Sequence, residues 1–171
     1  MAFALVRAGI WLRGRAENVA AALLATMFIA FIIQIVFRYV LNWPLGWTHE
    51  VCILAWLWGV LWGAAFIVTE ADEIRFDVIY GAVSENTRRV FSLITGAALV
   101  GIYGISLPAV TDYVRFMRVE RSAYLKIPFD WLFSIYVVFA VATLIRYLWL
   151  MGRAVRGEAP AALDHARIRD L

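Results

Sequence analysis

The chain has 171 residues, of which 64% are hydrophobic and 17% are charged. Soluble domains are nearer half apolar and a quarter charged, so this composition excludes an ordinary soluble domain and indicates an integral membrane protein. The net charge of +3 comes from arginine, since Lys126 is the only lysine. In a membrane protein such a bias reports topology rather than nucleic-acid binding. Cys52 is the single cysteine and has no partner for an internal disulfide.

The N-terminal segment, residues 1–16, places arginines among apolar residues at helical spacing. This pattern predicts a short helix on the cytoplasmic membrane surface. The stretch from Asn18 to Phe37 carries no charge, and a transmembrane helix needs about 20 such residues. We therefore predict a first span over about residues 18–40. A cleaved signal peptide fits less well, because the apolar run is longer than the hydrophobic region of a signal peptide.

A short turn interrupts the hydrophobic sequence after this span. Its residues with turn-forming chemistry are Asn42, Pro44 and Gly46. Arg38 and Glu50 flank the turn with opposite charges, and Trp47 is an aromatic residue of the kind that lies at the lipid–water boundary. We predict a tight hairpin between two spans, with an ion pair between Arg38 and Glu50 at headgroup depth.

The second predicted span covers about residues 48–69. Small residues recur in it one helical turn apart, namely Ala55, Gly59 and Gly63. They leave a face without large side chains, which another helix can approach closely. Trp58 and Trp62 lie beside this face, and an indole N–H at mid-depth requires a hydrogen-bond partner. The pattern fits packing inside this chain and contact with another protein equally well.

Charged and apolar residues are mixed in the segment after the second span, and on a helix they leave a broad apolar surface. We predict an amphipathic interfacial helix over about residues 73–84. A strand is the alternative, but its open edge would leave backbone groups unpaired at the bilayer. For Arg75 and Asp77 we favour a surface helix with a snorkelling arginine over contact with a partner.

Two later uncharged stretches predict spans over about residues 88–112 and 130–151, with Pro108 kinking or ending the first of them. Four spans put both termini on one side, and most basic residues fall on that side, so we predict cytoplasmic termini. The expected fold class is an all-α membrane protein with four transmembrane helices. The membrane domain covers residues 17–152, and a polar cytoplasmic tail covers residues 153–171.

The predicted spans lack the chemistry of a transport core or an enzyme. Ion-coupled carriers place ionisable groups near the bilayer midplane, whereas Glu50, Glu70 and Asp112 lie at span ends. The only histidines are His49, at an interface, and His165, in the tail, so axial haem ligands within the spans are missing. We therefore expect no catalytic, metal-binding or cofactor-binding residue, no cofactor and no enzyme activity. The chain is best interpreted as an accessory subunit of a membrane complex.

Several short stretches occur in a distinctive order: Gln34 to Tyr39, Asn42 with Pro44, Trp47 to Glu50, Trp56 to Ala65, Ile74 to Val78, and Ser122 to Pro128 before Tyr136. Together they resemble the small membrane subunit (DctQ type) of the tripartite ATP-independent periplasmic, or TRAP, transporters. The resemblance spans roughly residues 20–150. Two positions depart from it: the family often has an acidic residue in place of His49, and a basic residue or histidine in place of Glu73.

The resemblance implies an accessory subunit of a sodium-coupled uptake system for organic acids in the bacterial inner membrane. In this family a large membrane subunit (DctM type) binds substrate and sodium, and a soluble periplasmic protein (DctP type) captures the substrate. The small subunit is expected to extend the fixed scaffold of the large subunit and to help dock the binding protein. The residues expected at the contact with the large subunit are Ala55, Trp58, Gly59, Trp62 and Gly63.

For the first hairpin, a structural role is favoured over direct docking of the binding protein; its residues are Arg38, Asn42, Pro44, Trp47 and Glu50. Two other classes of function stay open. A membrane anchor subunit of a redox or other enzyme complex would carry haem or quinone. A self-sufficient channel or exporter would form a homo-oligomer and transport by itself.

Overall fold

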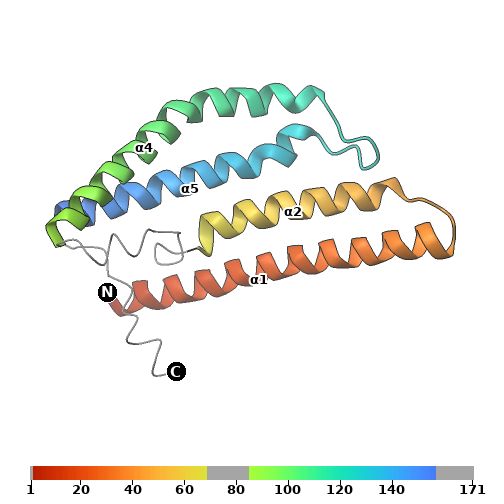
Figure 1. The fold of residues 1–171 in the computed structure, drawn as a ribbon, viewed down its shortest axis with the longest axis horizontal. Helices are drawn as coiled ribbons and strands as arrows, with labels where there is room; N and C mark the ends of the chain where they lie inside the picture. Colours follow the sequence, from red (N-terminus) through yellow and green to blue (C-terminus); the bar gives the residue numbers. More distant parts are fainter. Residues whose placement is uncertain (1, 69–84, 157–171) are drawn as a thin grey trace. The chain divides into compact units, whose positions relative to one another are not determined.

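The computed structural model describes residues 2–68 and 85–156, and every regular element in these ranges is helical (Figure 1). The long helices are α1 (Ala2–Ile35), α2 (Gly46–Phe66), α4 (Glu85–Phe116) and α5 (Phe129–Val155). A π-helix, η1 (Val36–Val40), continues α1, and a short 3-10 helix, η2 (Met117–Val119), continues α4. All 4 long helices contain a stretch that is long and apolar enough to cross a membrane.

The predicted all-α fold with four possible membrane spans is therefore confirmed for the described part of the chain. The stretches able to cross a membrane are Trp11–Val40, Gly46–Phe66, Val90–Val119 and Phe129–Val155. The predicted interfacial helix over residues 73–84, with Arg75 and Asp77, lies outside the described residues. The cytoplasmic location of the termini remains a prediction.

The N-terminal segment does not form a helix of its own, because α1 continues without a break into the first span. The sequence after Gly14 is rich in alanine and leucine, which favour helix, and contains no proline that would end it. Arg13 Nε donates a hydrogen bond of 3.2 Å to Glu17 Oε1 one turn later. This pair joins the predicted surface segment to the predicted span within one helix.

The chain divides into two compact units. Unit 1 comprises Met1–Ile67 and Pro108–Ala140, and unit 2 comprises Val68–Leu107 and Val141–Leu171. The helices α4 and α5 each contribute to both units. Pro108, which the sequence predicts to kink or end the third span, lies inside α4, and the helix continues beyond it.

Unit 1 contains α1 and α2 side by side as an antiparallel pair (Figure 1). Its buried apolar positions are mostly small, and the alanines among them are Ala16, Ala30, Ala55, Ala65 and Ala140. Lipid chains are as apolar as leucine, so helices in a membrane associate through close packing rather than through the hydrophobic effect. Small side chains on the facing surfaces allow this close approach.

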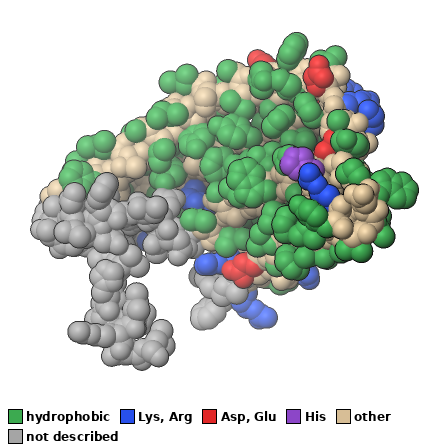
Figure 2. Space-filling view, turned by 45° about the vertical axis from the view of Figure 1, so that its right-hand side comes forward, with side chains coloured by type: hydrophobic (Ala, Val, Ile, Leu, Met, Phe, Trp, Pro, Cys, Tyr) green, Lys and Arg blue, Asp and Glu red, His purple; other side chains and the backbone are tan. Residues whose placement is uncertain are grey.

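Large hydrophobic side chains remain on the outside of the helices, and in Figure 2 they cover much of the visible surface that belongs to described residues. Examples from different helices are Phe28, Trp56, Ile105 and Trp149, all of which are exposed. A soluble protein rarely exposes so much contiguous apolar surface. This surface is suited to lipid or to other membrane proteins.

In unit 2, α4 and α5 approach each other closely at Gly96, which is buried. A Cβ atom added at this position would lie 2.7 Å from Met151 Cγ and 3.1 Å from Met151 Sδ. Gly101, on the same helix, has nothing within 4 Å of an added Cβ. The two glycines therefore differ in what a side chain would meet.

We expect Gly96→Leu to lower the thermal stability of the detergent-solubilised chain, because overpacking a tight contact costs about 1–3 kcal/mol. Gly101→Leu is the matched control and is expected to unfold at nearly the wild-type temperature. The measurement is loss of helical circular dichroism on heating. Equal destabilisation by the two substitutions would contradict the close approach of α4 and α5 at Gly96.

Candidate functional site

The α1–α2 turn, residues 41–45, closes the first hairpin of unit 1. The Leu41 N–H donates to Val36 O at 3.2 Å, and the Trp43 N–H donates to Phe37 O at 2.8 Å, so the wide π-helical turn ends α1. Asn42 has φ 54°, a left-handed conformation that asparagine tolerates better than most residues. The predicted tight turn is present where the sequence placed it.

The α4–α5 loop, residues 120–128, folds back on itself within the same unit. The Ser122 N–H donates to Ile127 O at 3.0 Å, and the Ile127 N–H donates to Ser122 Oγ at 3.1 Å. The Phe129 N–H donates to Glu120 O at 3.0 Å, and Lys126 takes a left-handed φ of 56°. None of these bonds involves the N–H groups at the tip of the loop, so the acceptors for those groups come from outside the loop.

Glu50, from the N-terminal part of α2, supplies the missing acceptors. Its Oε1 accepts the Tyr124 N–H at 2.8 Å, and its Oε2 accepts the Leu125 N–H at 2.9 Å. Successive backbone N–H groups that point the same way form a cradle for an anion, and bonds to an ionised acceptor are stronger than neutral ones. One carboxylate thus joins the first hairpin to the loop that connects the last two helices.

A second contact joins these two segments. The Tyr124 ring occupies the space in which a Cβ atom of residue 46 would lie. Gly46 begins α2 and has no left-handed φ, so it is needed here for room rather than for turn conformation. Thr48 is completely buried beside it, and its Oγ1 donates to Leu45 O at 2.9 Å.

The predicted ion pair between Arg38 and Glu50 is wrong. Within residues 2–68 and 85–156, Arg38 forms no ion pair, and both oxygens of Glu50 accept backbone N–H groups of the α4–α5 loop. The physical reason is that two successive loop N–H groups fit the two oxygens of one carboxylate, and such charge-assisted bonds are strong, whereas the exposed Arg38 can be solvated. The sequence carried a partial signal, the stretch from Ser122 to Pro128, but nothing in it identified the carboxylate that the loop meets.

The tryptophans of α2 find their partners inside unit 1. Trp58 Nε1 donates to Leu132 O at 3.1 Å, and its ring stacks on Trp131 with centroids 5.2 Å apart. Trp62 Nε1 donates to Ala16 O at 3.1 Å. Each indole N–H thus has the hydrogen-bond partner that was expected from the sequence, and this partner is a backbone carbonyl oxygen of a neighbouring helix.

The small-residue face of α2 divides into an inner and an open part. Ala55 is only 4% exposed, and a Cβ at Gly59 would lie 3.9 Å from Leu23 Cβ of α1. At Gly63 an added Cβ would meet nothing within 4 Å. Trp56 and Val60, which precede Gly63 by seven and three positions, are more than half exposed. The sequence placed Trp56 near the small-residue stripe but did not single out Val60.

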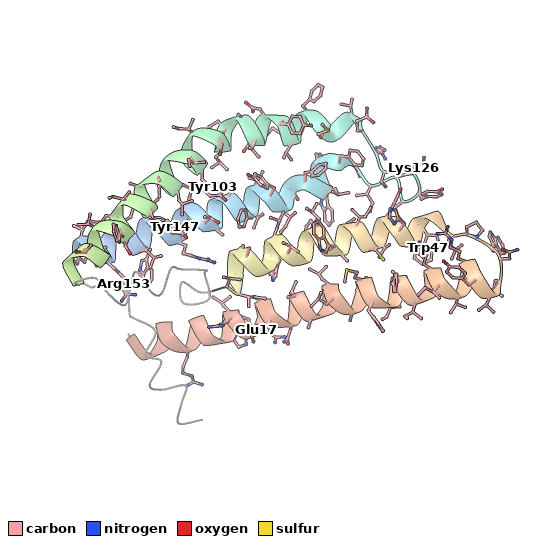
Figure 3. All side chains as sticks on the ribbon, viewed as in Figure 1. Glu17, Trp47, Tyr103, Lys126, Tyr147 and Arg153 are labelled. Carbon is pink, nitrogen blue, oxygen red and sulfur yellow. The ribbon has the colours of Figure 1, made fainter. Side chains whose placement is uncertain are left out.

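The ends of the helices around the two connections carry exposed cations. These are Arg38, Arg115, Arg118, Arg121 and Lys126. Lys126 and Trp47 lie at the same end of unit 1 (Figure 3). Exposed aromatic residues accompany the cations, among them Tyr39, Trp43 and Tyr124. We call this set of cations and aromatics the connection surface.

The family model of the tripartite ATP-independent periplasmic transporters, DctQ component, matches residues 16–157. The chain belongs to this family. The match includes α2, α4 and α5 completely, together with the part of α1 that can cross a membrane beyond Ala16. A search among curated proteins found no match.

Membership makes this chain the DctQ component, the small membrane subunit, of a TRAP transporter. It is a component of a multi-pass membrane transporter, which places it in a transporter family rather than an enzyme family. The matched family thus favours the transporter subunit over the anchor of an enzyme complex. Within the ranges that the structure describes, no three His, Cys, Asp or Glu side chains are grouped to hold a metal ion.

We expect Glu50→Gln to release the α4–α5 loop, because the substitution turns one acceptor into an amide donor that faces a backbone N–H. Trypsin should then cleave after Lys126 several-fold faster in the detergent-solubilised protein. Glu120→Gln is the matched control. It removes a carboxylate from the same loop, and the hydrogen bonds that Glu120 makes there come from its backbone. Equal cleavage of the wild type and both variants would show that Glu50 does not hold the loop.

Proposed function

We propose that this DctQ component packs on the large, DctM-type membrane subunit, extends its fixed scaffold, and helps to dock the periplasmic DctP-type binding protein. The complex takes up an organic acid together with sodium across the bacterial inner membrane. The observation that carries this proposal is the family match over residues 16–157. Substrate and sodium are handled by the large subunit, so this chain is an accessory component without a catalytic site.

The proposed topology has both termini in the cytoplasm. Four crossings then place the α1–α2 turn and the α4–α5 loop on the periplasmic side. The periplasmic side is where a soluble binding protein must arrive. The connection surface lies at these two segments, and the carboxylate of Glu50 holds them together.

We assign the contact with the large subunit to the open side of α2. Trp56, Val60 and Gly63 share one helix face at helical spacing, and none of them is buried in unit 1. Tryptophan supplies a large contact area, and the glycine lets a neighbouring backbone approach closely. Ala55, Trp58, Gly59 and Trp62 then support this face from inside the chain.

The connection surface is proposed to receive an acidic face of the binding protein. Its exposed cations outnumber the exposed carboxylates of the same loop and helix ends, Asp112 and Glu120. Glu50 keeps its negative charge, but both of its oxygens accept N–H groups of the loop. Asn42, Pro44 and Trp47 shape the turn beneath it, and Arg38 is a member of the docking surface rather than of an internal ion pair.

We expect Gly63→Leu to weaken co-purification with the large subunit, because a leucine side chain would separate the two helices at a site that is open in this chain. Gly59→Leu, on the side that faces Leu23, should instead lower the stability of the chain itself. The measurements are the ratio of the two subunits after mild-detergent purification and the thermal stability of the isolated chain. Undiminished co-purification of stable Gly63→Leu would contradict the assigned face.

We expect Arg118→Glu to slow association of the binding protein with the reconstituted complex several-fold at low salt, and less at high salt, because exposed charges act mainly on the association rate. Arg156→Glu, at the end of α5 and on the proposed cytoplasmic side, is the control. The association rate of the binding protein is measured at two salt concentrations, with nanodiscs that contain the complex immobilised on a sensor surface. Equal effects of the two substitutions would overturn docking at the connection surface.

A further inference from the structure

The pentapeptide Trp-Leu-x-Gly-Arg occurs twice in the described residues. One copy is Trp11 to Arg15 in α1, and the other is Trp149 to Arg153 in α5. The first copy lies before the residues matched by the family model, and the second lies within them. Neither copy takes part in the connection surface or in the proposed contact with the large subunit.

Both copies adopt the same local geometry. The Arg15 Cζ lies 5.2 Å from the centroid of the Trp11 ring, and the Arg153 Cζ lies 4.9 Å from the centroid of the Trp149 ring. A spacing of four residues brings the two side chains to one side of a helix, where the guanidinium is attracted to the face of the indole. The two tryptophan side chains are each 60% exposed.

Each pair lies at the end of a stretch that can cross a membrane. Trp11 begins the first such stretch, and Arg153 lies in the last turn of the fourth (Figure 3). Four crossings bring the chain back to the face from which it started, so both pairs lie at the same leaflet, the cytoplasmic one in the proposed topology. At this depth the surroundings change from hydrocarbon to phosphate groups and water.

The charges around the first copy leave its arginine available for an anion. Arg13 is paired with Glu17, whereas Arg15 has no carboxylate partner among the described residues. Stacking uses the face of the guanidinium and leaves its N–H donors at the edge, where they match the geometry of a phosphate group. An added Cβ at Gly14 or Gly152 would meet nothing within 4 Å, so a headgroup can approach the helix backbone beside each pair.

We propose that each Trp–Arg pair binds the phosphate of an anionic phospholipid, of the phosphatidylglycerol class, from the cytoplasmic leaflet. The guanidinium donates to the phosphate oxygens while the indole keeps it oriented. Exposed apolar neighbours, Leu12 beside the first pair and Leu148 beside the second, contact the acyl chains. Lipid rather than free phosphate is the occupant, because the pairs lie where spans meet the bilayer surface and combine a cation with apolar area.

The test measures lipid binding to the purified full-length chain by native mass spectrometry, titrating phosphatidylglycerol and, separately, phosphatidylcholine. We expect Arg15→Gln and Arg153→Gln each to weaken phosphatidylglycerol binding by about fivefold, the effect of one basic residue at an anionic surface. Arg13→Gln and Arg156→Gln remove the same charge without a stacked ring and are the controls. Arg15→Lys keeps the charge but not the planar fork, so it should fall between wild type and Arg15→Gln.

The proposal is overturned if the control substitutions weaken binding as much as those at the stacked arginines, since the attraction would then be diffuse. Equal affinity of the wild type for phosphatidylglycerol and phosphatidylcholine would also overturn it. So would competition by inorganic phosphate at millimolar concentration, which would mean that the pairs bind the free anion. Unchanged phosphatidylglycerol binding in Arg15→Gln and Arg153→Gln would likewise overturn it. None of these outcomes depends on docking at the connection surface.

Discussion

The Glu50 carboxylate makes the interaction on which the end of unit 1 that carries the α1–α2 turn and the α4–α5 loop depends. It accepts N–H groups from two successive residues of the α4–α5 loop, and the loop has no acceptors of its own for them. Bonds from backbone N–H groups to an ionised acceptor are stronger than bonds between neutral groups, so this carboxylate holds the loop firmly. One side chain of α2 therefore determines where the connection between the last two helices lies, and with it the arrangement of the exposed cations.

The need of an N–H group for an acceptor also explains the tryptophans of α2. Both indole N–H groups bond to carbonyl oxygens of neighbouring helices, Trp58 to Leu132 and Trp62 to Ala16. Tryptophan in the middle of a span is thus used inside the chain as a polar link with a large apolar body. At the span ends, Trp11 and Trp149 instead lie outside with arginines over their rings. One residue type performs two tasks, according to depth and neighbours.

Much of the architecture was predictable. Composition and uncharged stretches identified four helices able to span a membrane, and Asn42 and Pro44 identified the first turn. The family was recognisable from stretches spread over the chain and is confirmed by the match. The sequence predicted the small-residue face of α2 but not which part of it is covered. Ala55 and Gly63 follow the same pattern, yet Ala55 is buried and an added Cβ at Gly63 would meet nothing within 4 Å. The periodicity of the small residues predicts that they share one helix face, but it does not predict what packs against that face.

The amino-acid sequence by itself determined the membrane class and the helices, because these follow from hydrophobicity along the chain, which is a local property. It also determined the family, because the stretches that carry the resemblance are read directly from the chain. Only the tertiary structure decided the partner of Glu50, which lies 74 residues before Tyr124 in the sequence. It also decided that Gly46 is needed for the Tyr124 ring rather than for a positive φ. A carboxylate accepts from whichever donors packing brings within reach, and no local pattern states which donors those are.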